Sequence, residues 1–268
     1  MKYYVVDAFT SQVFKGNPAG VCLLDQPLPT EWMQKIAQEN NLSETAFVLQ
    51  NGQNYELRWF TPKFEIDLCG HATLAAAYVI SNFVQTDIQK ICFSTQSGNL
   101  EITRNEHQYE MQFPNRAPSA VMLSPQQLIS ANCTPISAYA SRDLILLLNS
   151  EQEVRDYIPS YSELCKLTDW LGVVITARGI HTDFVSRYFC PELGIEDPVT
   201  GSSHCSLIPF WAKRLGKNKM TAAQLSKRGG MLQCELLDEH TVKISGEATL
   251  FLQGKITADI QSMYASYN

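Results

Sequence analysis

The sequence has no Cys-x-x-Cys pair, no run of basic residues and no apolar stretch near the ~20 residues that span a membrane. Its eight cysteines are scattered, so we expect neither a disulfide framework nor a structural zinc site. The net charge of -6 argues against nucleic-acid binding. Residues 1–7 have the pattern of an early strand rather than of a secretory signal. We therefore expect a soluble, cytoplasmic protein.

A glycine-rich phosphate loop and a regular alternation of strands with helices are also missing. Both are expected of a parallel α/β fold that binds nucleotides, which makes that alternative unattractive. The segment from Pro114 to Pro125 holds three prolines, which indicates a linker instead. A chain of 268 residues has room for two units of about 130 residues on either side of such a linker.

An internal repeat is the clearest positive feature. The pattern Arg58-Trp59-Phe60-x-Pro62-x-x-x-Ile66 returns 129 residues later as Arg187-Tyr188-Phe189-x-Pro191-x-x-x-Ile195. A glycine and a helix-like run follow each copy, beginning at Gly70 and at Gly201. This is the signature of a tandem duplication, which predicts one half over 1–115 and another over 116–268. The last strand is expected to pack back on the first half, and a cleft is expected between the copies.

Each copy has one apolar helix that the pattern predicts to be central. Residues 72–80 are apolar nearly all round, which is typical of a buried helix. The counterpart runs from Ser202 to Leu215 and should stop at Gly216, but Pro209 predicts a kink or a later start. The fold class predicted is α+β, with two similar units of mostly antiparallel sheet around one helix.

Several local signals fix the ends of smaller elements. Ser124-Pro125 has the N-cap and first-position proline of a helix start. Ser160 and Glu163 have the spacing of a capping box, and Thr30 is expected to cap the helix that follows it. Residues 16–20 are expected to form a turn.

Two glycines introduce the first candidate for a binding site. Gly70 and Gly201 each precede a central helix, whose first N–H groups and positive dipole end could bind a carboxylate. The plainer interpretation is that both glycines only permit tight turns.

The two copies differ where chemistry would be expected. His71 follows the first glycine, whereas Ser202 follows the second. Asp197 lies in a segment two residues longer than its counterpart, so we place it in an insertion beside the ligand. Glu44 lies at the end of a predicted strand, next to Thr45. The second copy has Leu171-Gly172 at the equivalent point and no acid. Both acids are candidate catalytic groups, with ordinary surface or capping acids as the alternative.

Six segments carry a family resemblance. The segments are Asp7-Ala8-Phe9-Thr10, Gly16-Asn17-Pro18-Ala19-Gly20, Ser43-Glu44-Thr45-Ala46-Phe47, Phe60-Thr61-Pro62, Cys69-Gly70-His71-Ala72-Thr73 and Glu196-Asp197-Pro198-Val199-Thr200-Gly201-Ser202. Together they resemble the PhzF family of phenazine-biosynthesis-like isomerases, from residue 1 to near the C-terminus.

The resemblance implies a diaminopimelate epimerase-like fold, a homodimer, and an active site between the halves that needs no cofactor and no metal. It implies Glu44 as general acid/base, His71 as a partner in proton transfer or substrate binding, and Asp197 as an acid that holds the substrate. The substrate implied is a small metabolite with a carboxylate. The residues implied to bind it are Gly70, Ala72, Gly201, Ser202 and Asn17.

Two other functions remain open on the sequence. One is a metabolite- or partner-binding protein on this fold that has no turnover. The other is a thiol-dependent racemase, but the residue matching Cys69 in the second copy is Thr200, so a second thiol is missing. Cys69 is therefore expected to be a small buried residue, and His204 and Cys205 to lie within the second central helix.

Overall fold

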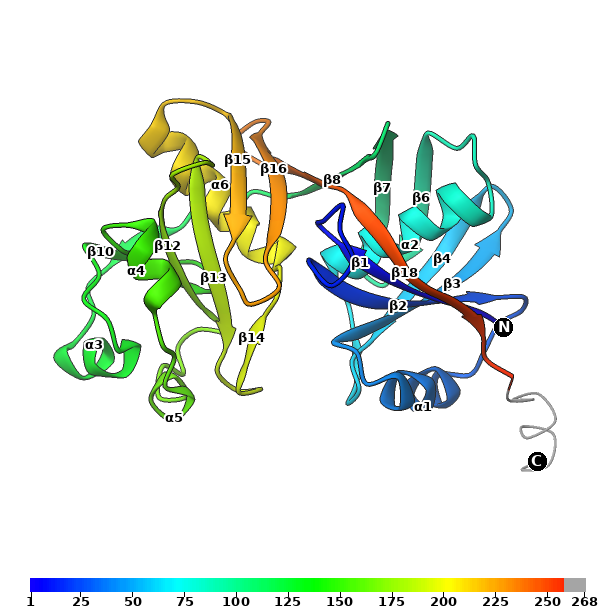
Figure 1. The fold of residues 1–268 in the computed structure, drawn as a ribbon, viewed down its shortest axis with the longest axis horizontal. Coiled ribbons are helices and arrows are strands. Elements are labelled where there is room, and N and C mark those ends of the chain that lie inside the picture. The colour runs from blue at the N-terminus through cyan, green and yellow to red at the C-terminus, as the bar shows by residue number, and fades with distance from the viewer. Residues whose placement is uncertain (258–268) are drawn as a thin grey trace. The chain divides into compact units, whose positions relative to one another are not determined.

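The computed structural model describes residues 1–257, so the part of the predicted second half at 258–268 lies outside the described residues. The described chain divides into two compact units (Figure 1). Among the described residues, unit 1 contains Met1–Phe14, Pro18–Tyr109 and residues 247–257. Unit 2 contains Lys15–Asn17 and Glu110–Gly246.

Unit 1 is a mixed sheet with two helices. Its strands pair in parallel at β2–β3 and β4–β6, and antiparallel at β1–β18, β3–β4, β4–β5 and β6–β7. The elements are β1 (Lys2–Ala8), β2 (Asn17–Leu24), α1 (Thr30–Asn40), β3 (Glu44–Asn51), β4 (Asn54–Phe60), β5 (Glu65–Ile66), α2 (Gly70–Phe83), β6 (Lys90–Thr95), β7 (Gly98–Asn105) and β18 (Ala248–Lys255).

Unit 2 repeats this order of pairings. The pairs β11–β12 and β13–β15 are parallel, whereas β12–β13, β13–β14 and β15–β16 are antiparallel. A strand that continues from unit 1, β8 (Gln108–Pro114), leads into it. Its elements are β9 (Ser119–Val121), α3 (Pro125–Ala131), β10 (Ser137–Ala140), β11 (Leu144–Leu147), α4 (Glu151–Asp156), α5 (Tyr161–Leu164), β12 (Val173–Arg178), β13 (Phe184–Cys190), β14 (Ile195–Asp197), α6 (Gly201–Leu215), β15 (Lys219–Gln224), β16 (Gly230–Leu236) and β17 (Thr241–Gly246).

The shared topology bears out the predicted α+β fold of two similar units. The strands β2 to β7 of unit 1 match β11 to β16 of unit 2, pairing for pairing. In both units the long helix follows the short strand that closes a hairpin, so α2 corresponds to α6. The repeat in the sequence therefore corresponds to a repeat of strand order and strand pairing in the fold.

Strand register corrects the alignment of the two copies. Trp59 of β4 pairs with Ile66, whereas its counterpart Tyr188 of β13 pairs with Asp197. Asp197 therefore matches Ile66, and Ile195 does not. Three residues then separate each from the helix glycine, at Gly70 or Gly201, so the prediction that Asp197 lies in an insertion is wrong. The two extra residues, Cys190 and Ile195, pair with each other and lengthen the β13–β14 hairpin before its turn.

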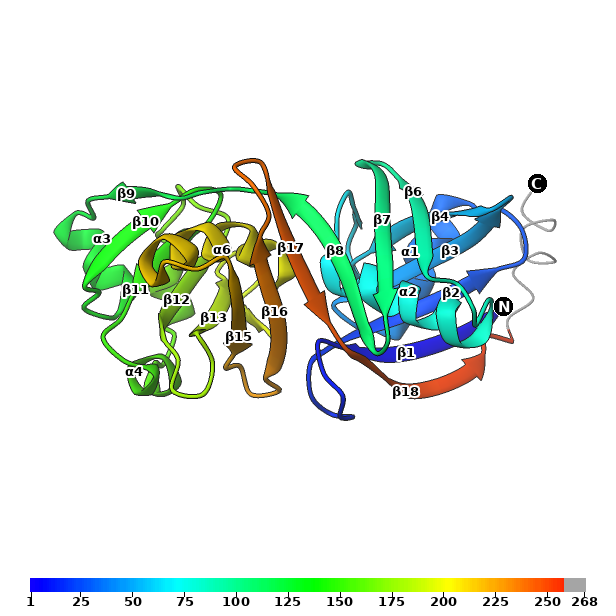
Figure 2. The same cartoon turned by 90° about the horizontal axis from the view of Figure 1, so that it is seen from above.

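The two long helices are central to their units, as predicted. In α2 every residue from His71 to Ala77 is buried, and the helix contacts β1 and β3 of its own unit (Figures 1 and 2). In α6 the residues from Ser203 to Ala212 are buried, and the helix contacts β15, β16 and β17. The helix begins at Gly201 despite Pro209, so a later start was the wrong expectation, and Gly216 ends it in a left-handed conformation.

Some local expectations need correction. The predicted turn at 16–20 is mostly strand, because β2 begins at Asn17. Thr30 is the first residue of α1 but does not cap it, and its hydroxyl instead accepts a hydrogen bond from Arg58. Ser124 does cap α3, whereas Ser160 makes no side-chain cap of α5.

Each unit has an apolar core formed by helix and strand side chains. In unit 1 the apolar face of α1 packs over β3 and β4, where Phe47 and Phe60 meet edge to face at 5.4 Å. In unit 2 Trp211 of α6 stacks on Phe184 of β13 at 5.6 Å. Burying each such side chain contributes about 1.5–3 kcal/mol.

Among the described residues, no helix is long and apolar enough to cross a membrane.

Candidate active site

Glu44 and His71 lie together in unit 1. Glu44 is the first residue of β3, and His71 is the second residue of α2. Glu44 Oε2 is 3.0 Å from His71 Nε2, and the two side chains are only 16% and 7% exposed. Two predicted site residues that are 27 positions apart in the chain therefore form one buried acid–base pair.

Cys69 extends this pair to a third side chain. It occupies the N-cap position of α2, and its Sγ lies 3.5 Å from His71 Nδ1. The imidazole is thus held at both ring nitrogens, by a carboxylate on one side and a sulfur on the other. The expectation that Cys69 is buried holds, but the cysteine also contacts a candidate catalytic group.

The pKa values in this group have separate physical causes. Burial acts to lower the pKa of His71, but Cys69 and the Glu44 carboxylate together raise it well above its usual range. Burial raises the pKa of the Cys69 thiol, although His71 opposes that effect. Cys69 and Glu44 therefore both favour the protonated form of the His71 imidazole.

Glu44, Cys69 and His71 are also residue types that bind metal ions. One ligand atom from each lies within 4.8 Å of the others. Both ring nitrogens of His71 already have partners in this arrangement, so a metal ion would have to displace one of them. We interpret the group as an acid–base chain joined by an ion pair between Glu44 and His71 and a hydrogen bond between His71 and Cys69.

The glycine and alanine beside His71 complete the start of α2. Gly70 opens the helix, and Ala72 is fully buried behind it. The first N–H groups of a helix have no partner within the helix, so they are available to an anion. The structure thus gives Gly70 the position at a helix start that the sequence predicts.

Asp197 lies in unit 2, at the end of β14, and two side chains hold its carboxylate. Asn17 Nδ2 donates to Asp197 Oδ1 at 2.8 Å and to the carbonyl of Val199 at 2.9 Å. The hydroxyl of Thr200 donates to Asp197 Oδ2. Asn17 was predicted to bind substrate; it is fully buried, and these two hydrogen bonds make it a support of the candidate acid.

Sequence reasoning missed two supporting residues in unit 2. Gln224 is fully buried and bonds the carbonyl of Asp197 at 2.8 Å and the amide of Thr200 at 2.9 Å. Arg142 donates to the hydroxyl of Ser202 at 3.0 Å, so the second residue of α6 is held in place by a guanidinium. No local motif marks either residue, because both act through contacts distant in the sequence.

The counterpart of Glu44 in unit 2 explains why only one copy has the acid. Strand pairing matches Glu44 with Gly172, as the sequence suggested. A Cβ atom on Gly172 would lie 2.2 Å from the Tyr188 hydroxyl, so no side chain fits there. That hydroxyl donates instead to the buried Asp143 at 3.2 Å.

His204 is not part of the group formed by Glu44, Cys69 and His71. It lies in α6, as expected, and is fully buried beside Phe184. Its Nδ1 donates to the carbonyl of Thr200 at 2.9 Å, and among the residues that the structure describes no group bonds to Nε2. Burial lowers its pKa to about 4, so His204 is neutral and structural.

This histidine predicts a loss of stability in acid. Because the unfolded chain takes up a proton near pH 6.5 and the folded chain only near pH 4, folding becomes less favourable as the pH falls between these values. The loss is about 3 kcal/mol. Urea unfolding of the wild type and His204→Gln at pH 7 and pH 4.5 measures it. The wild type should lose more stability than the variant, and equal losses would contradict the assignment.

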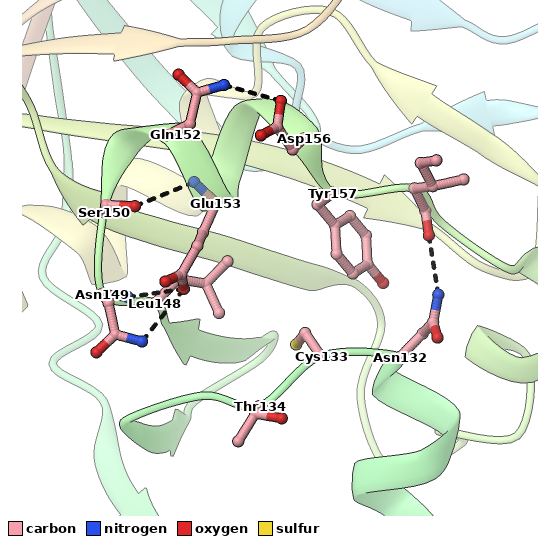
Figure 3. A pocket seen from close by; sticks show the side chains of 11 residues that line it. Asn132, Cys133, Thr134, Leu148, Asn149, Ser150, Gln152, Glu153, Asp156 and Tyr157 are labelled. Carbon is pink, nitrogen blue, oxygen red and sulfur yellow. Dashed lines mark hydrogen bonds between the residues drawn. The ribbon is translucent and has the colours of Figure 1, made fainter.

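A separate hollow of 570 Å³ lies in unit 2, between α3, α4 and the end of β11 (Figure 3). Its polar groups are largely satisfied within the protein. Glu153 accepts from Asn149, and Tyr157 donates to the carbonyl of Ala131. None of the predicted site residues lines it, so the hollow is not part of the acid–base group.

The repeated α+β unit, with a buried group of Glu44, His71 and Cys69 at the start of one central helix, defines a class of two-unit α+β proteins. Comparison with known proteins gives the family. The profile of the phenazine-biosynthesis-like proteins matches residues 6–254, and the chain belongs to this PhzC-PhzF family.

Close relatives cover nearly the whole chain. A Pseudomonas aeruginosa protein named an uncharacterized isomerase is 46% identical over 96% of this chain and 98% of its own. A crystal structure of a phenazine-biosynthesis PhzC/PhzF protein from Clostridium difficile is 67% identical, with a TM-score of 0.94 over 96% of this chain and 99% of that one. A PhzF-family structure from Enterococcus faecalis is 48% identical, with a TM-score of 0.92 over 95% and 98%.

The fold also extends beyond the family. A probable proline racemase from Agrobacterium radiobacter has a TM-score of 0.66 at 10% identity, over 96% of this chain and 93% of its own. At that identity the likeness concerns the fold alone. It agrees with the predicted epimerase-like architecture.

Proposed function

We propose that the protein is an isomerase or epimerase that moves a proton on a small, carboxylate-bearing metabolite, with Glu44 as general acid/base. The family assignment and the relative named an isomerase support the reaction class. The observation that carries the assignment of Glu44 is its buried contact with His71 at the start of α2.

The chemistry needs only groups that the chain supplies. The Glu44 carboxylate removes a proton from carbon, and the electron pair moves into a conjugated carbonyl or π system of the substrate. The same carboxyl group then returns the proton to another carbon or to the other face. His71 stabilises the carboxylate through Nε2–H, and the first N–H groups of α2 are suited to a carboxylate of the substrate. Nothing is oxidised or reduced overall.

The proposal includes the absence of a cofactor and of a metal from the reaction, and a homodimer as the working form. Protein treated with EDTA and dialysed should keep its full rate, and sedimentation should give twice the chain mass. Loss of activity that added metal restores would overturn the first point, and a monomer at micromolar concentration would overturn the second.

The function is tested by incubating the protein with a pooled metabolite extract in heavy water and analysing the products by mass spectrometry. An isomerase predicts a metabolite that gains deuterium or converts to an isomer. Because a proton returned without exchange with solvent leaves no label, new isomers are scored as well as labels. If a metabolite binds but neither exchanges nor changes, the protein is a binding module.

A thiol-dependent racemase is the remaining alternative of a different kind. It needs a second acid–base thiol, and the position in unit 2 that corresponds to Cys69 is Thr200, whose hydroxyl is committed to Asp197. Cys205 is buried in α6, and burial raises its pKa to about 11. These observations favour the carboxylate as the acid/base.

Asp197 should matter for activity as well as for structure. In Asp197→Asn the side chain presents an acceptor at one atom only, so either Asn17 or Thr200 faces an N–H group. We expect a loss of about 10- to 100-fold in kcat/KM and of about 1–3 kcal/mol in stability. Steady-state kinetics and urea unfolding measure these losses, with the exposed Asp87→Asn as the control. Unchanged kinetics would remove Asp197 from the site.

A further inference from the structure

Cys69 is the residue of the acid–base group to which the proposed reaction assigns no step. Its sulfur lies 3.5 Å from His71 Nδ1, while the opposite ring nitrogen lies 3.0 Å from Glu44. The two contacts lie at the two ring nitrogens of the imidazole. With either one missing, the ring could rotate about its bond to Cβ and carry Nε2–H away from the carboxylate.

The backbone of Cys69 is held by hydrogen bonds to its carbonyl oxygen. The carbonyl of Cys69 accepts from Thr73 twice, from Oγ1 at 2.6 Å and from the amide nitrogen at 3.1 Å. Cys69 itself is 7% exposed, and Thr73 is 1% exposed. The backbone of Cys69 is therefore held to the first turn of α2, which also carries His71.

The corresponding residue of unit 2 has a comparable task. Thr200 precedes α6 as Cys69 precedes α2, and its hydroxyl donates to the carboxylate of Asp197. The carbonyl of Thr200 is bonded by His204, as the carbonyl of Cys69 is bonded by Thr73. In both units, the residue before the central helix thus supports a neighbouring acid–base side chain.

A nucleophilic role for Cys69 is less consistent with its surroundings. A reactive thiol is normally ionised and accessible. The Cys69 side chain is buried, and burial raises its pKa. A protonated sulfur can still accept a hydrogen bond from an imidazolium, although as an uncharged sulfur it accepts more weakly than a carboxylate does.

We propose that Cys69 is a positioning residue, whose sulfur accepts the Nδ1–H of His71 and so keeps the ring protonated with Nε2–H directed at Glu44. The consequence for turnover rests on the proposed function of Glu44. The hydrogen bond itself does not. The titratable groups acting on His71 from the elements around it are Cys69 before α2 and Glu44 on β3.

The test is an NMR titration of ¹⁵N-histidine-labelled protein, in which His71 is recognised by the signal missing from His71→Asn. In Cys69→Ala, the buried Nδ1–H of the imidazolium loses its sulfur acceptor. The titration midpoint of His71 should therefore fall by roughly one to two pH units. Cys69→Ser, which keeps an acceptor, should lie between the wild type and Cys69→Ala. Cys92→Ala, on β6 of the same unit, should match the wild type.

An unchanged midpoint in folded Cys69→Ala would overturn the inference. If that variant does not fold, the wild type alone decides. Below its midpoint, His71 should show both ring N–H signals, each protected from exchange with water, and a rapidly exchanging Nδ1–H would overturn the inference. Since the titration needs no substrate, failure of the proton-exchange assay would count against the proposed function and leave this result intact.

Discussion

Glu44→Gln should lower the rate of substrate proton exchange by about 10²–10⁴-fold, the range typical of a lost general acid/base. The amide has nearly the shape of the carboxyl group but does not accept a proton at neutral pH. It can still accept a hydrogen bond from His71 through its oxygen, so the fold of unit 1 should survive. Deuterium incorporation into the metabolite identified by the exchange screen gives the rate, and binding is followed separately by calorimetry.

The control is Glu56→Gln, on an exposed position of β4 in the same unit. It removes one negative charge without touching the acid–base group, and its exchange rate should equal that of the wild type. If both variants lose activity alike, the effect comes from net charge or stability. Full activity in Glu44→Gln would remove Glu44 from the mechanism.

Arg187→Met should lower the stability of unit 2 by about 3–5 kcal/mol, the cost typical of breaking a buried ion pair. The guanidinium of Arg187 bonds both oxygens of Glu196, at 2.7 and 2.9 Å, and its third nitrogen donates to the carbonyl of Tyr157 at 2.7 Å. Methionine fills the space but leaves a mostly buried carboxylate and a buried carbonyl without a donor. Urea unfolding measures the change.

The duplication supplies a matched control in Arg58→Met. Arg58 is the repeat counterpart of Arg187 and bonds both oxygens of Glu65, at 2.6 and 2.7 Å. Its side chain is 31% exposed, however, whereas that of Arg187 is 10% exposed. Solvent should limit its loss to about 1 kcal/mol. Similar losses for both variants would contradict the argument that burial makes the difference.

The duplication, the fold class and the buried central helices could be predicted because they follow from local patterns. Strand alternation and the apolar run at residues 72–80 are visible within a few positions. Glu44 and His71 were predicted as site residues from the differences between the copies and from the resemblance. Their roles stay predictions, although the structure brings the two side chains together.

What the sequence could not predict depends on contacts between distant residues. Asn17 holds Asp197 across 180 positions, and Gln224 holds the same segment from β15. The position of Asp197 was misjudged because aligning Ile66 with Ile195 places the two extra residues after Ile195, whereas the register places both before Asp197, in the hairpin. The contact of Cys69 with His71 depends on a side-chain direction that spacing does not specify.

The central claim, that Glu44 and His71 act as one acid–base unit, is tested most directly by comparing Glu44→Gln, His71→Asn and the double variant in the deuterium-exchange assay. Residues that act as a unit give strongly non-additive losses. The double variant should therefore exchange about as slowly as Glu44→Gln alone. A double variant whose loss is the product of the two single losses would show that the residues act independently, and would contradict the account.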